Sequence, residues 1–463
     1  MKYLPEDNTI VALSSPLGNG AIAVIRVSGN ECLEVMNPLL KRKTSAEDAR
    51  KAIFNEIIDP ETGGSIDQVV TTYFVSPHSY SGEDVMEISC HCNTLIINKI
   101  IEKCVQQGAR IAEPGEFTFR AFMNGKLDLS QAEAVAEIIN ARSRQSLSQS
   151  IRHLEGRLSE RIHGIKDDIL SNLALLEINL DFSDEEIDVM PLQEMLEKLE
   201  SVSAQITSLL RTYDYGRLLQ EGIKLIILGK PNVGKSSLLN SLLERDRAIV
   251  SEIPGTTRDY IEANLEIGGL AVQAVDTAGI RQTEDTVEAI GVERALEQIQ
   301  TADIALCVFE GHTEIDSDDQ ALIDIIDKHR NDVNFVTVLN KMDLNISRET
   351  ERLLKDSGVP TARISAKDGN GIAALKDLIK TSLLADEGME SEEIVVTSAR
   401  HKAALEKTIT ALHNAAEAIK LSATEEIIAV DIRLALDHLG EITGETTSED
   451  VINHIFANFC IGK

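Results

Sequence analysis

The segment Gly222–Ser237, which reads GIKLIILGKPNVGKSS, constrains the fold more than any other part of the chain. A run of aliphatic residues ends at Gly229 and leads into the pattern G-x-x-x-x-G-K-[ST], completed by Gly234, Lys235 and Ser236. Glycines let successive backbone N–H groups turn toward phosphate oxygens, and a helix beginning at the lysine adds its positive N-terminus. The lysine reaches the outer phosphates, and the serine hydroxyl binds Mg²⁺. The pattern predicts a buried strand, a phosphate-binding loop and a helix.

Length and charge limit the function classes. A chain of 463 residues should hold two to four domains. Asp and Glu number 76 against 45 Lys and Arg, and the net charge of −31 argues against broad adhesion to nucleic acid or anionic membrane. A local basic patch and specific RNA contact stay open. The six cysteines are too sparse for a disulfide framework, and there is no signal peptide or long apolar run, so we expect a cytoplasmic protein without a membrane partner.

Shifts in pattern divide the chain into four segments. Residues 1–120 alternate short apolar runs with turn signals, which is typical of an α+β domain. Residues 121–220 and 386–463 have helical apolar spacing, and residues 221–385 alternate strand and helix patterns, which predicts a parallel, doubly wound α/β domain. Because helical segments flank it, we expect this domain to be inserted into one all-α helical domain. The elements expected in the first segment are strands Thr9–Leu13, Ala21–Val27, Val69–Val75 and Val85–Ser89 and a helix over Leu95–Gln107.

Two local patterns could bind a metal ion, and a third predicts where a helix begins. Cys90-His91-Cys92 could suggest a metal site, but strand alternation separates the histidine from the cysteines and no second pair follows at zinc spacing, which favours structural cysteines. The acidic stretch Asp181–Asp188 could bind a cation, although a solvated loop is the commoner outcome. Ser130 and Glu133 predict a capping box at the start of a helix.

Three later motifs narrow the phosphate loop to a GTP site. Asp276-Thr277-Ala278-Gly279 follows a predicted strand, where an Asp can hold the Mg²⁺ shell and a Gly N–H can sense the γ-phosphate. Asn340-Lys341-Met342-Asp343 follows another, where a carboxylate accepts both guanine N1–H and N2–H, a pairing that adenine cannot offer. Ser365-Ala366-Lys367 follows the last strand and can contact guanine O6 through its backbone. Four motifs in this order predict a Ras-like P-loop GTPase domain.

The segment between these motifs contains the expected switch residues. A threonine in Ser251–Asp259 completes Mg²⁺ coordination in many GTPases, and we assign Thr257. Ile280 stands where many GTPases place a glutamine that orients the attacking water, and isoleucine cannot do so. The acidic residues that follow are Glu284, Asp285 and Glu288. From the residues alone, each is interpreted as a solvated acid.

Over essentially its whole length the chain resembles the MnmE (TrmE) family of tRNA-modification GTPases. The matching segments are Ala21–Gly29, SGEDVMEI, PGEFTFRAFMNGKLDLSQAEA, GKPNVGKSSLLN, IPGTTRD, DTAGIR and the terminal FCIGK. The resemblance implies a folate-binding N-terminal domain, a helical domain interrupted by the G domain, and a homodimer formed through the N-terminal domains. It also implies a flavoprotein partner, MnmG (GidA), and addition of a carboxymethylaminomethyl-type group to carbon 5 of the wobble uridine of certain tRNAs.

The resemblance also assigns ions and a catalytic acid. Asn232 matches the family's K⁺ ligand in the phosphate loop, and the loop positions that complete K⁺ coordination match Ser251, Ile253 and Thr256. Ser236 and Thr257 match the Mg²⁺ ligands. Glu288 matches the acid that orients the nucleophilic water, and the G domains pair when GTP and K⁺ bind. The full set expected at GTP is Asn232, Val233, Gly234, Lys235, Ser236, Ser237, Ser251, Glu252, Ile253, Pro254, Gly255, Thr256, Thr257, Asp276, Thr277, Ala278, Gly279, Asn340, Lys341, Asp343, Ser365, Ala366 and Lys367.

For 5-formyltetrahydrofolate or a related folate, the matching positions are Arg26, Glu87, Lys126 and Lys463. Cys460 is retained in the tail, where it is either a small buried hydrophobe or a residue with a direct chemical role. The chain departs from the family pattern around the expected folate region at Asn19, Cys92, Asn93 and Glu113. An alternative function is a GTPase that acts only as a switch or assembly factor, for example in ribosome biogenesis. The folate positions and the tail favour the tRNA-modifying enzyme.

Overall fold

The computed structural model describes residues 8–18, 20–181, 191–243, 262–276, 298–344, 347–383 and 394–463. The described residues form two compact units. The first unit consists of the described residues within Met1–Ala136, Arg152–Ile206 and Ala403–Lys463. The second unit consists of those within Glu137–Ile151 and Thr207–Lys402.

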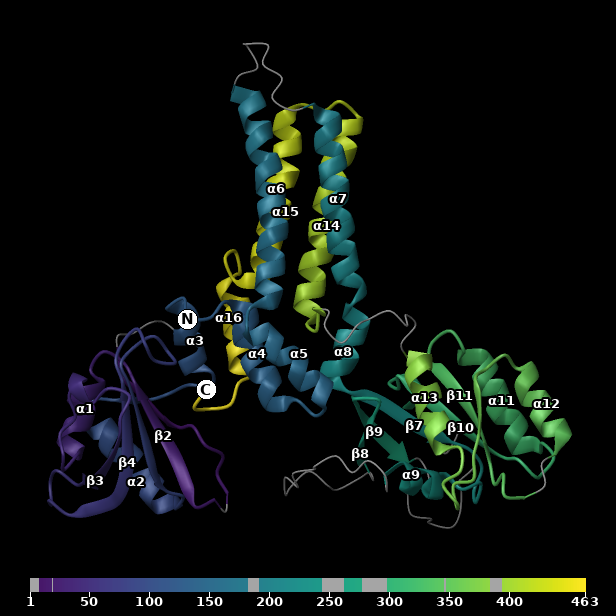
Figure 1. Ribbon diagram of the computed structural model, residues 1–463, viewed down its shortest axis with the longest axis horizontal. Helices are drawn as coiled ribbons and strands as arrows, with labels where there is room; N and C mark the ends of the chain where they lie inside the picture. The colour runs from purple at the N-terminus through teal and green to yellow at the C-terminus, as the bar shows by residue number, and fades with distance from the viewer. Residues whose placement is uncertain are drawn as a thin grey trace. The chain divides into compact units, whose positions relative to one another are not determined.

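A six-stranded sheet in the order β3-β4-β5-β2-β1-β6 forms the N-terminal domain of the first unit (Figure 1). Its pairs are antiparallel except β1 with β6. Strand alternation puts Ile25, Val27 and Ile88 in one core with the helices on that face, and leaves Arg26 and Glu87 on the other face. The elements are β1 (Ile10–Leu13), β2 (Ile22–Ser28), α1 (Cys32–Met36), the 3₁₀ turns η1 (Asn37–Leu39) and η2 (Ala46–Asp48), β3 (Ala52–Ile58), β4 (Ser65–Phe74), β5 (Val85–His91), α2 (Thr94–Gln106) and β6 (Arg110–Ile111).

The four predicted strands and the helix are confirmed, whereas β3 and the two-residue β6 are additional to the prediction. The cysteines of Cys90-His91-Cys92 fit the structural interpretation. Cys90 is 2% exposed, and burial raises the pKa of its thiol to about 11. His91 pairs with Asp67. Within the described residues, no group of three His, Cys, Asp or Glu side chains could hold a metal ion. Residues 182–190 of the predicted acidic loop lie outside the described residues.

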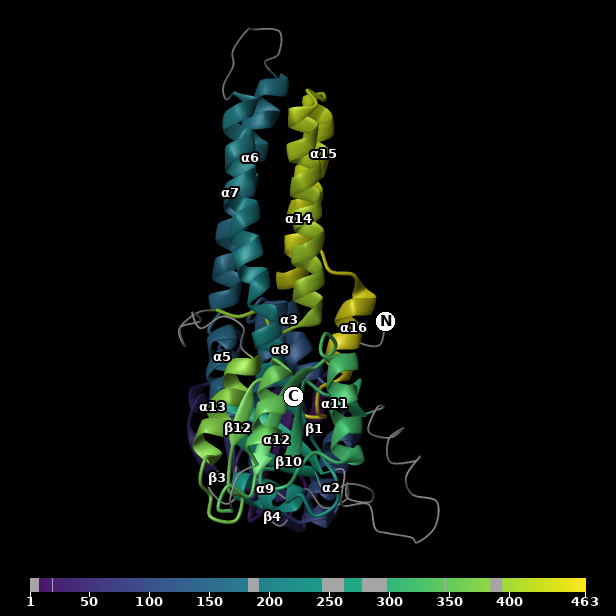
Figure 2. The same ribbon diagram turned by 90° about the vertical axis from the view of Figure 1, so that its right-hand side faces the viewer.

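Long helices from both flanks of the G domain run side by side in both views (Figures 1 and 2). These are α6 (Arg157–Asp181), α7 (Leu192–Arg211), α14 (Ala399–Lys420) and α15 (Glu425–Thr443), with the shorter helices α3 (Glu116–Met123), α4 (Leu129–Asn140) and α16 (Glu449–Ala457). Two further short helices, α5 (Arg144–Leu154) and α8 (Tyr213–Glu221), lie mostly or wholly in the second unit. Phe119 of α3 meets Phe456 of α16 edge to face at 5.4 Å between ring centroids. The helical domain is therefore built from segments distant in sequence. No helix in the described part of the chain is both long and apolar enough to cross a membrane.

The predicted capping box of Ser130 and Glu133 is wrong. Asp128 precedes α4, and its Oδ1 accepts a hydrogen bond from the Gln131 N–H at 2.9 Å. The Gln131 Oε1 in turn accepts from the Asp128 N–H at 3.0 Å. Ser130 lies inside the helix, where its hydroxyl donates to Asp128 at 2.8 Å. The carboxylate two residues earlier caps the helix, because it reaches the free N–H groups of the first turn.

The second sheet has the order β12-β11-β10-β7-β9-β8 and is parallel except for β8, which pairs antiparallel with β9. Leu225 and Ile227 of β7 pack with α9 and α13, whereas Ile226 and Leu228 pack with α11 and α12, so helices cover both faces as predicted. The elements are β7 (Ile223–Leu228), α9 (Lys235–Leu243), β8 (Glu262–Ile267), β9 (Leu270–Asp276), β10 (Ile304–Glu310), α11 (Ser317–His329), β11 (Asn334–Asn340), α12 (Arg348–Asp356), β12 (Thr361–Arg363) and α13 (Ile372–Leu383).

Candidate functional site

The nucleotide motifs lie at one edge of the second sheet. In parallel strands the carboxyl ends meet at the same edge, where α/β proteins bind ligands. The register pairs Ile227 with Asp276 and Glu310 with Asn340, so the loops after β7, β9, β10 and β11 begin side by side. Only the backbone of Asp276 is described. The sheet thus brings the phosphate loop and the expected base-recognition loop together.

The phosphate loop has the tight backbone that its sequence predicts. Gly229 has a φ of +148° and Gly234 a φ of +102°, and a Cβ on Gly234 would lie 2.3 Å from Asn340 Nδ2. Glycine is therefore required there by conformation and by space. Asn232, at the tip, has a left-handed φ of +62° and an exposed side chain. Lys235 Nζ donates to the carbonyl oxygens of Gly229 at 2.7 Å and Lys230 at 2.9 Å, so the lysine crosses the loop.

Asn340 joins the phosphate loop to the last motif. Its Nδ2 donates to the Val233 carbonyl at 2.8 Å, and its Oδ1 accepts from the Ala366 N–H at 3.0 Å. The side chain is 2% exposed, so both groups of the amide are satisfied inside the domain. Asn340 therefore positions two loops, and its contact with GTP stays a prediction.

Asp343 has an exposed carboxylate at this edge, as does Asp368. The Asp343 Oδ1 lies 3.0 Å from the Ser365 hydroxyl, which lies equally close to Asp368 Oδ2. Lys341 has a left-handed φ of +64° and its Nζ pairs with Glu310 at the end of β10. Ser365 and Ala366 are buried, while Lys367 is exposed beside them. The arrangement leaves Asp343 at the surface with its orientation set by a serine.

A charge cluster that sequence reasoning missed holds the start of the phosphate loop. Lys230 Nζ lies 2.7 Å from Asp316 Oδ2 and 2.8 Å from Asp319 Oδ2. Asp316 begins α11 in a capping box with Asp319. The Lys230 hydrogen bond, with the N–H groups of the first turn of α11, lowers the pKa of Asp316 to about 2. The Asp-x-x-Asp spacing predicts a cap, but no pattern in the sequence pairs it with a lysine 86 residues earlier.

Several predicted residues of this site lie outside the described residues. These are Ser251, Glu252, Ile253, Pro254, Gly255, Thr256, Thr257, Thr277, Ala278, Gly279 and Glu288. Ser236 and Ser237 open α9 with exposed side chains, directly after the loop.

A second polar site lies on the face of the N-terminal sheet that packs against Phe117 of α3. Arg26 and Glu87 are directly opposite in the register of β2 and β5. Arg26 donates to Glu87 Oε1 through Nε at 3.1 Å and through Nη2 at 2.8 Å. Its guanidinium carbon lies 4.9 Å from the centroid of the Tyr80 ring and 5.5 Å from that of Phe117. An arginine flanked by rings and a carboxylate suits a ligand with both aromatic and polar groups.

The C-terminal tail reaches the same place. The Gly462 carbonyl accepts from Ser14 Oγ at 3.0 Å and lies 3.5 Å from Arg26 Nη1. A Cβ on Gly462 would lie 2.1 Å from the Leu13 carbonyl, which explains the glycine. Burial and the nearby charge of Arg26 lower the pKa of the Lys463 amine. The Cys460 side chain is exposed, so the buried alternative is wrong, and its carbonyl accepts from the Gly115 N–H at 3.4 Å.

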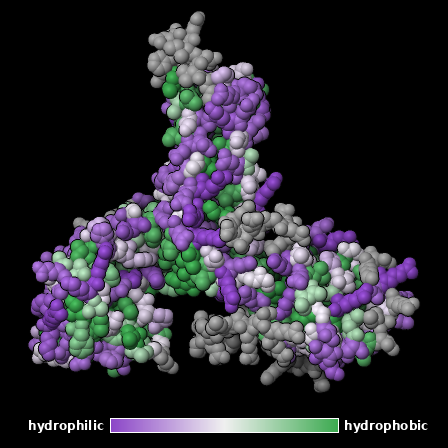
Figure 3. All heavy atoms as spheres, viewed as in Figure 1, coloured by the Kyte–Doolittle hydropathy of each residue, from purple (hydrophilic) through white to green (hydrophobic). Residues whose placement is uncertain are grey.

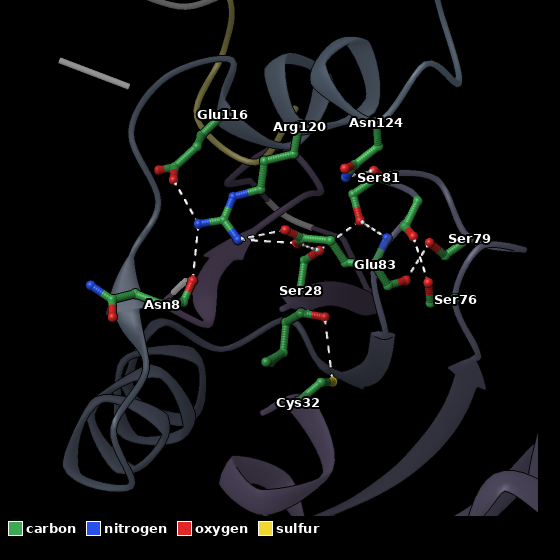
Figure 4. A network of polar contacts seen from close by, with 12 residues as sticks. Asn8, Ser28, Cys32, Ser76, Ser79, Ser81, Glu83, Glu116, Arg120 and Asn124 are labelled. Carbon is green, nitrogen blue, oxygen red and sulfur yellow. Dashed lines mark hydrogen bonds and ion pairs between the residues drawn. The ribbon is translucent and has the colours of Figure 1, made fainter. Parts of the chain in front are cut away.

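Lys126 lies beside the loop between β4 and β5, where its Cγ would be 3.2 Å from a Cβ on Gly82. A buried network fixes this loop (Figure 4). Arg120 donates to both oxygens of Glu83 at 3.0 and 3.1 Å and to Glu116 at 3.0 Å. The Ser28 hydroxyl bonds Glu83 and Ser81. The network thus ties the Tyr80 loop to α3 and β2.

Two of the departures from the family pattern, Asn93 and Cys92, make local hydrogen bonds through their side chains. Asn93 caps α2, because its Oδ1 accepts from the Leu95 N–H at 2.9 Å. Cys92 Sγ lies 3.4 Å from the Gly18 carbonyl. The Glu113 N–H donates to Glu116 at 2.9 Å, and Asn19 lies outside the described residues.

Comparison with known proteins agrees with this architecture. Residues 9–126 match the model of the GTP-binding protein TrmE N-terminus, and residues 129–460 match the MnmE helical domain. The chain is 41% identical over 460 residues to a tRNA modification GTPase MnmE from Natranaerobius thermophilus, covering 99% of this chain and 100% of that protein. It is 41% identical over 458 residues to the protein of that name from Geotalea uraniireducens, with 98% and 99% covered.

Among solved structures, the FeoB G-domain from Methanococcus jannaschii matches with 23% identity and a TM-score of 0.26, covering 35% of this chain and 97% of that one. The two family models together span the N-terminal domain and the helical domain with the G domain inserted in it. The chain therefore belongs to the MnmE (TrmE) family of tRNA modification GTPases.

Proposed function

We propose that this GTPase works as a homodimer with the flavoprotein MnmG (GidA) to add a carboxymethylaminomethyl-type group to carbon 5 of the wobble uridine of certain tRNAs. Pairing of two G domains, promoted by GTP and K⁺, accompanies hydrolysis. The single observation that carries this proposal is the Arg26–Glu87 pair in the N-terminal domain, which the C-terminal tail approaches at Gly462. A GTPase that acts only as a switch does not need such a site outside its G domain. Family membership favours tRNA modification over the ribosome-assembly alternative. The proposed domain boundaries are 1–120, 121–220, 221–385 and 386–463.

The residues at the phosphate loop suit the proposed ions. Ser236 opens α9 beside the loop and has the hydroxyl that Mg²⁺ prefers, with Thr257 as the second proposed ligand. The exposed amide of Asn232 would supply an oxygen ligand for K⁺, and Ser251, Ile253 and Thr256 would complete the proposed site. When bound, K⁺ would stabilise negative charge that develops on the phosphates. Lys235 would hold the outer phosphates after release from the loop carbonyls.

We expect GTP turnover to be at least about tenfold faster in KCl than in NaCl at equal ionic strength, which corresponds to about 1.4 kcal/mol of transition-state stabilisation. The measurement is single-turnover hydrolysis by the full chain. In Asn232→Ala the difference between the two salts should shrink, while Lys328→Ala, an exposed change on α11, serves as the control. Equal wild-type turnover in both salts would contradict the K⁺ site.

The N-terminal site suits a folate. Arg26 has donors beyond those used by Glu87, and Tyr80 and Phe117 supply aromatic faces. Lys463 and Lys126 add cations that suit the carboxylates of the ligand. When bound, the folate would carry a one-carbon unit to the region of the tail. Cys460 has an exposed thiol there, which fits the proposed chemical role.

Titration of the full chain with 5-formyltetrahydrofolate should show binding that weakens roughly 10–100-fold in Arg26→Gln, because losing hydrogen bonds to a charged group costs about 1.5–3 kcal/mol. Lys99→Gln, at a half-buried position of α2 that pairs with Glu102, is the control. GTP turnover without tRNA should stay at the wild-type value in both variants. If wild type does not bind the folate, or Arg26→Gln binds it equally well, the folate assignment is wrong.

A further inference from the structure

Consecutive basic residues of this acidic chain occur in one loop of the N-terminal domain. In 463 residues, neighbouring Lys or Arg residues occur at two places, Lys41-Arg42-Lys43 and Arg50-Lys51. Both lie between η1 and β3, and we call Lys41–Lys51 the basic loop. Residues 41–56 contain these five cations against Glu47, Asp48 and Glu56, a local net charge of +2 in a chain of −31. The local sign of charge is therefore opposite to that of the whole chain.

Two asparagine side chains fix the backbone of the basic loop. Asn55 of β3 is 4% exposed; its Oδ1 accepts from the Arg42 N–H at 3.0 Å and its Nδ2 donates to the Arg42 carbonyl at 2.8 Å. Asn37 does the same for Thr44, at 2.8 and 3.0 Å. A capping box between Ser45 and Asp48 closes the next turn. Each side-chain amide bonds both the N–H and the carbonyl of one loop residue, as a neighbouring strand would. The backbone of the three consecutive cations is therefore preorganised.

Arg50 shows backbone strain at the other end of the loop. Its φ is +59°, a left-handed conformation that costs a residue with a Cβ about 1–2 kcal/mol. Among the described residues, the other non-glycine residues with positive φ are Asn232, Lys341 and Ser422, and the first two belong to the nucleotide site. Such strain clusters at functional positions. An arginine stands where glycine or asparagine would be less strained.

The cations of the basic loop are available to a partner. The side chains of Lys41 and Arg42 are 67% and 61% exposed. Lys41 pairs with Glu56 and Arg42 with Asp48, but exposed ion pairs contribute only about 0–1 kcal/mol and exchange readily. A hollow of about 460 Å³ beside Lys43 is lined by Leu33, Glu34, Asn37 and Pro38. Its aliphatic surface next to cations suits a ribose next to phosphates. Figure 3 shows hydrophilic side chains at this margin of the domain, where Figure 1 places α1 and β3.

We propose that the basic loop binds the phosphate backbone of the tRNA substrate. An RNA approaching this chain is repelled by most of its surface, so a local group of cations decides where it is held. Phosphate contacts set position and orientation without reading sequence. The loop would therefore orient the tRNA and leave recognition of the uridine to other groups. An acidic protein surface and an anionic membrane could also bind lysines, and the test below separates them.

The test compares two full-length variants of equal charge. The loop variant has Lys41→Gln, Arg42→Gln, Lys43→Gln and Lys51→Gln. The control has Lys198→Gln, Lys328→Gln, Arg330→Gln and Lys420→Gln, which remove three lysines and one arginine from exposed positions on α7, α11 with its C-cap, and α14. The probe is unmodified substrate tRNA, with affinity measured between about 50 and 200 mM NaCl without nucleotide. GTP turnover without tRNA should be unchanged in both variants, which verifies folding.

We expect the loop variant to bind tRNA at least about tenfold more weakly at 100 mM NaCl. Its slope of log affinity against log salt should fall by about 0.7–0.9 for each phosphate that the loop no longer neutralises. The control should stay within about twofold of wild type in affinity and slope. Equal losses of affinity in both variants would mean a general charge effect and overturn the proposal. Unchanged tRNA binding in the loop variant would also overturn the proposal. If this variant instead bound phosphatidylserine vesicles or the flavoprotein more weakly than wild type, the loop would be assigned to that partner.

Discussion

A Glu288→Ala protein is expected to bind GTP almost as wild type and to hydrolyse it roughly 10²–10⁴-fold more slowly, the range for a positioned acid–base group. The reason is the apolar Ile280, which cannot orient the attacking water where many GTPases use glutamine. In the proposed mechanism the Glu288 carboxylate positions this water, directly or through a second water, when the G domains pair. Glu288 lies outside the described residues, so the assignment rests on the resemblance and on Ile280.

The measurement for Glu288 is single-turnover hydrolysis at saturating GTP and K⁺. Glu284→Ala and Asp285→Ala remove neighbouring acids of the same segment and should cost far less. Nucleotide affinity and G-domain pairing, followed separately, show whether the loss lies in the chemical step. Turnover of Glu288→Ala within about threefold of wild type would contradict the assignment and return the search to Glu284 and Asp285.

The position of the nucleotide motifs at one edge of the second sheet could be predicted from the sequence, because the alternation of strands and helices is a local pattern. Alternating strands and helices imply parallel strands, and parallel strands bring their following loops to one edge. The motifs at Gly234, Asn340 and Ser365 are each next to a strand, and the structure places them together. Two interactions could not be predicted from the sequence. The buried Asn340 amide links two loops, and Lys230 pairs with two aspartates of α11.

The N-terminal site could be predicted only by resemblance. Arg26 and Glu87 are 61 residues apart, and their contact depends on the register of β2 and β5, which alternation alone does not set. The Gly462 carbonyl comes from a position 436 residues after Arg26. Lys126 lies beside the Gly82 loop, which the Arg120–Glu83 network ties to α3. Contacts so distant in sequence arise from tertiary structure.

The missed strand β3 shows why alternation fails at particular residues. Ile53, Asn55 and Ile57 all point to the buried side, so a polar residue stands where the pattern requires an apolar one. Asn55 is buried because its amide bonds the backbone of Arg42. The break in the pattern thus marks the support of the basic loop. A polar residue at a core position is evidence of a specific partner.

An Asp343→Asn protein is expected to lose GTP affinity by roughly 10²–10⁴-fold and to gain affinity for xanthosine triphosphate. The carboxylate is exposed at the end of β11, and in the proposed site it accepts guanine N1–H and N2–H. Each hydrogen bond to a charged group contributes about 1.5–3 kcal/mol. An amide accepts only one of these donors and turns its own N–H₂ toward the other, whereas xanthine has a carbonyl at that position. Fluorescent-nucleotide titration with both bases measures the shift.

Asp368→Asn is the matched control for this prediction. Ser365 Oγ lies 3.0 Å from Asp343 and 3.0 Å from Asp368, so both variants disturb the same serine. Only Asp343 is proposed to contact the base, and the amide of Asp368→Asn can still accept a hydrogen bond from Ser365. Asp368→Asn should therefore weaken both nucleotides alike and by less than about tenfold. If Asp343→Asn keeps wild-type GTP affinity, the base lies elsewhere. If both variants lose GTP equally and neither gains xanthosine triphosphate, Asp343 supports the Ser365 loop and does not contact guanine.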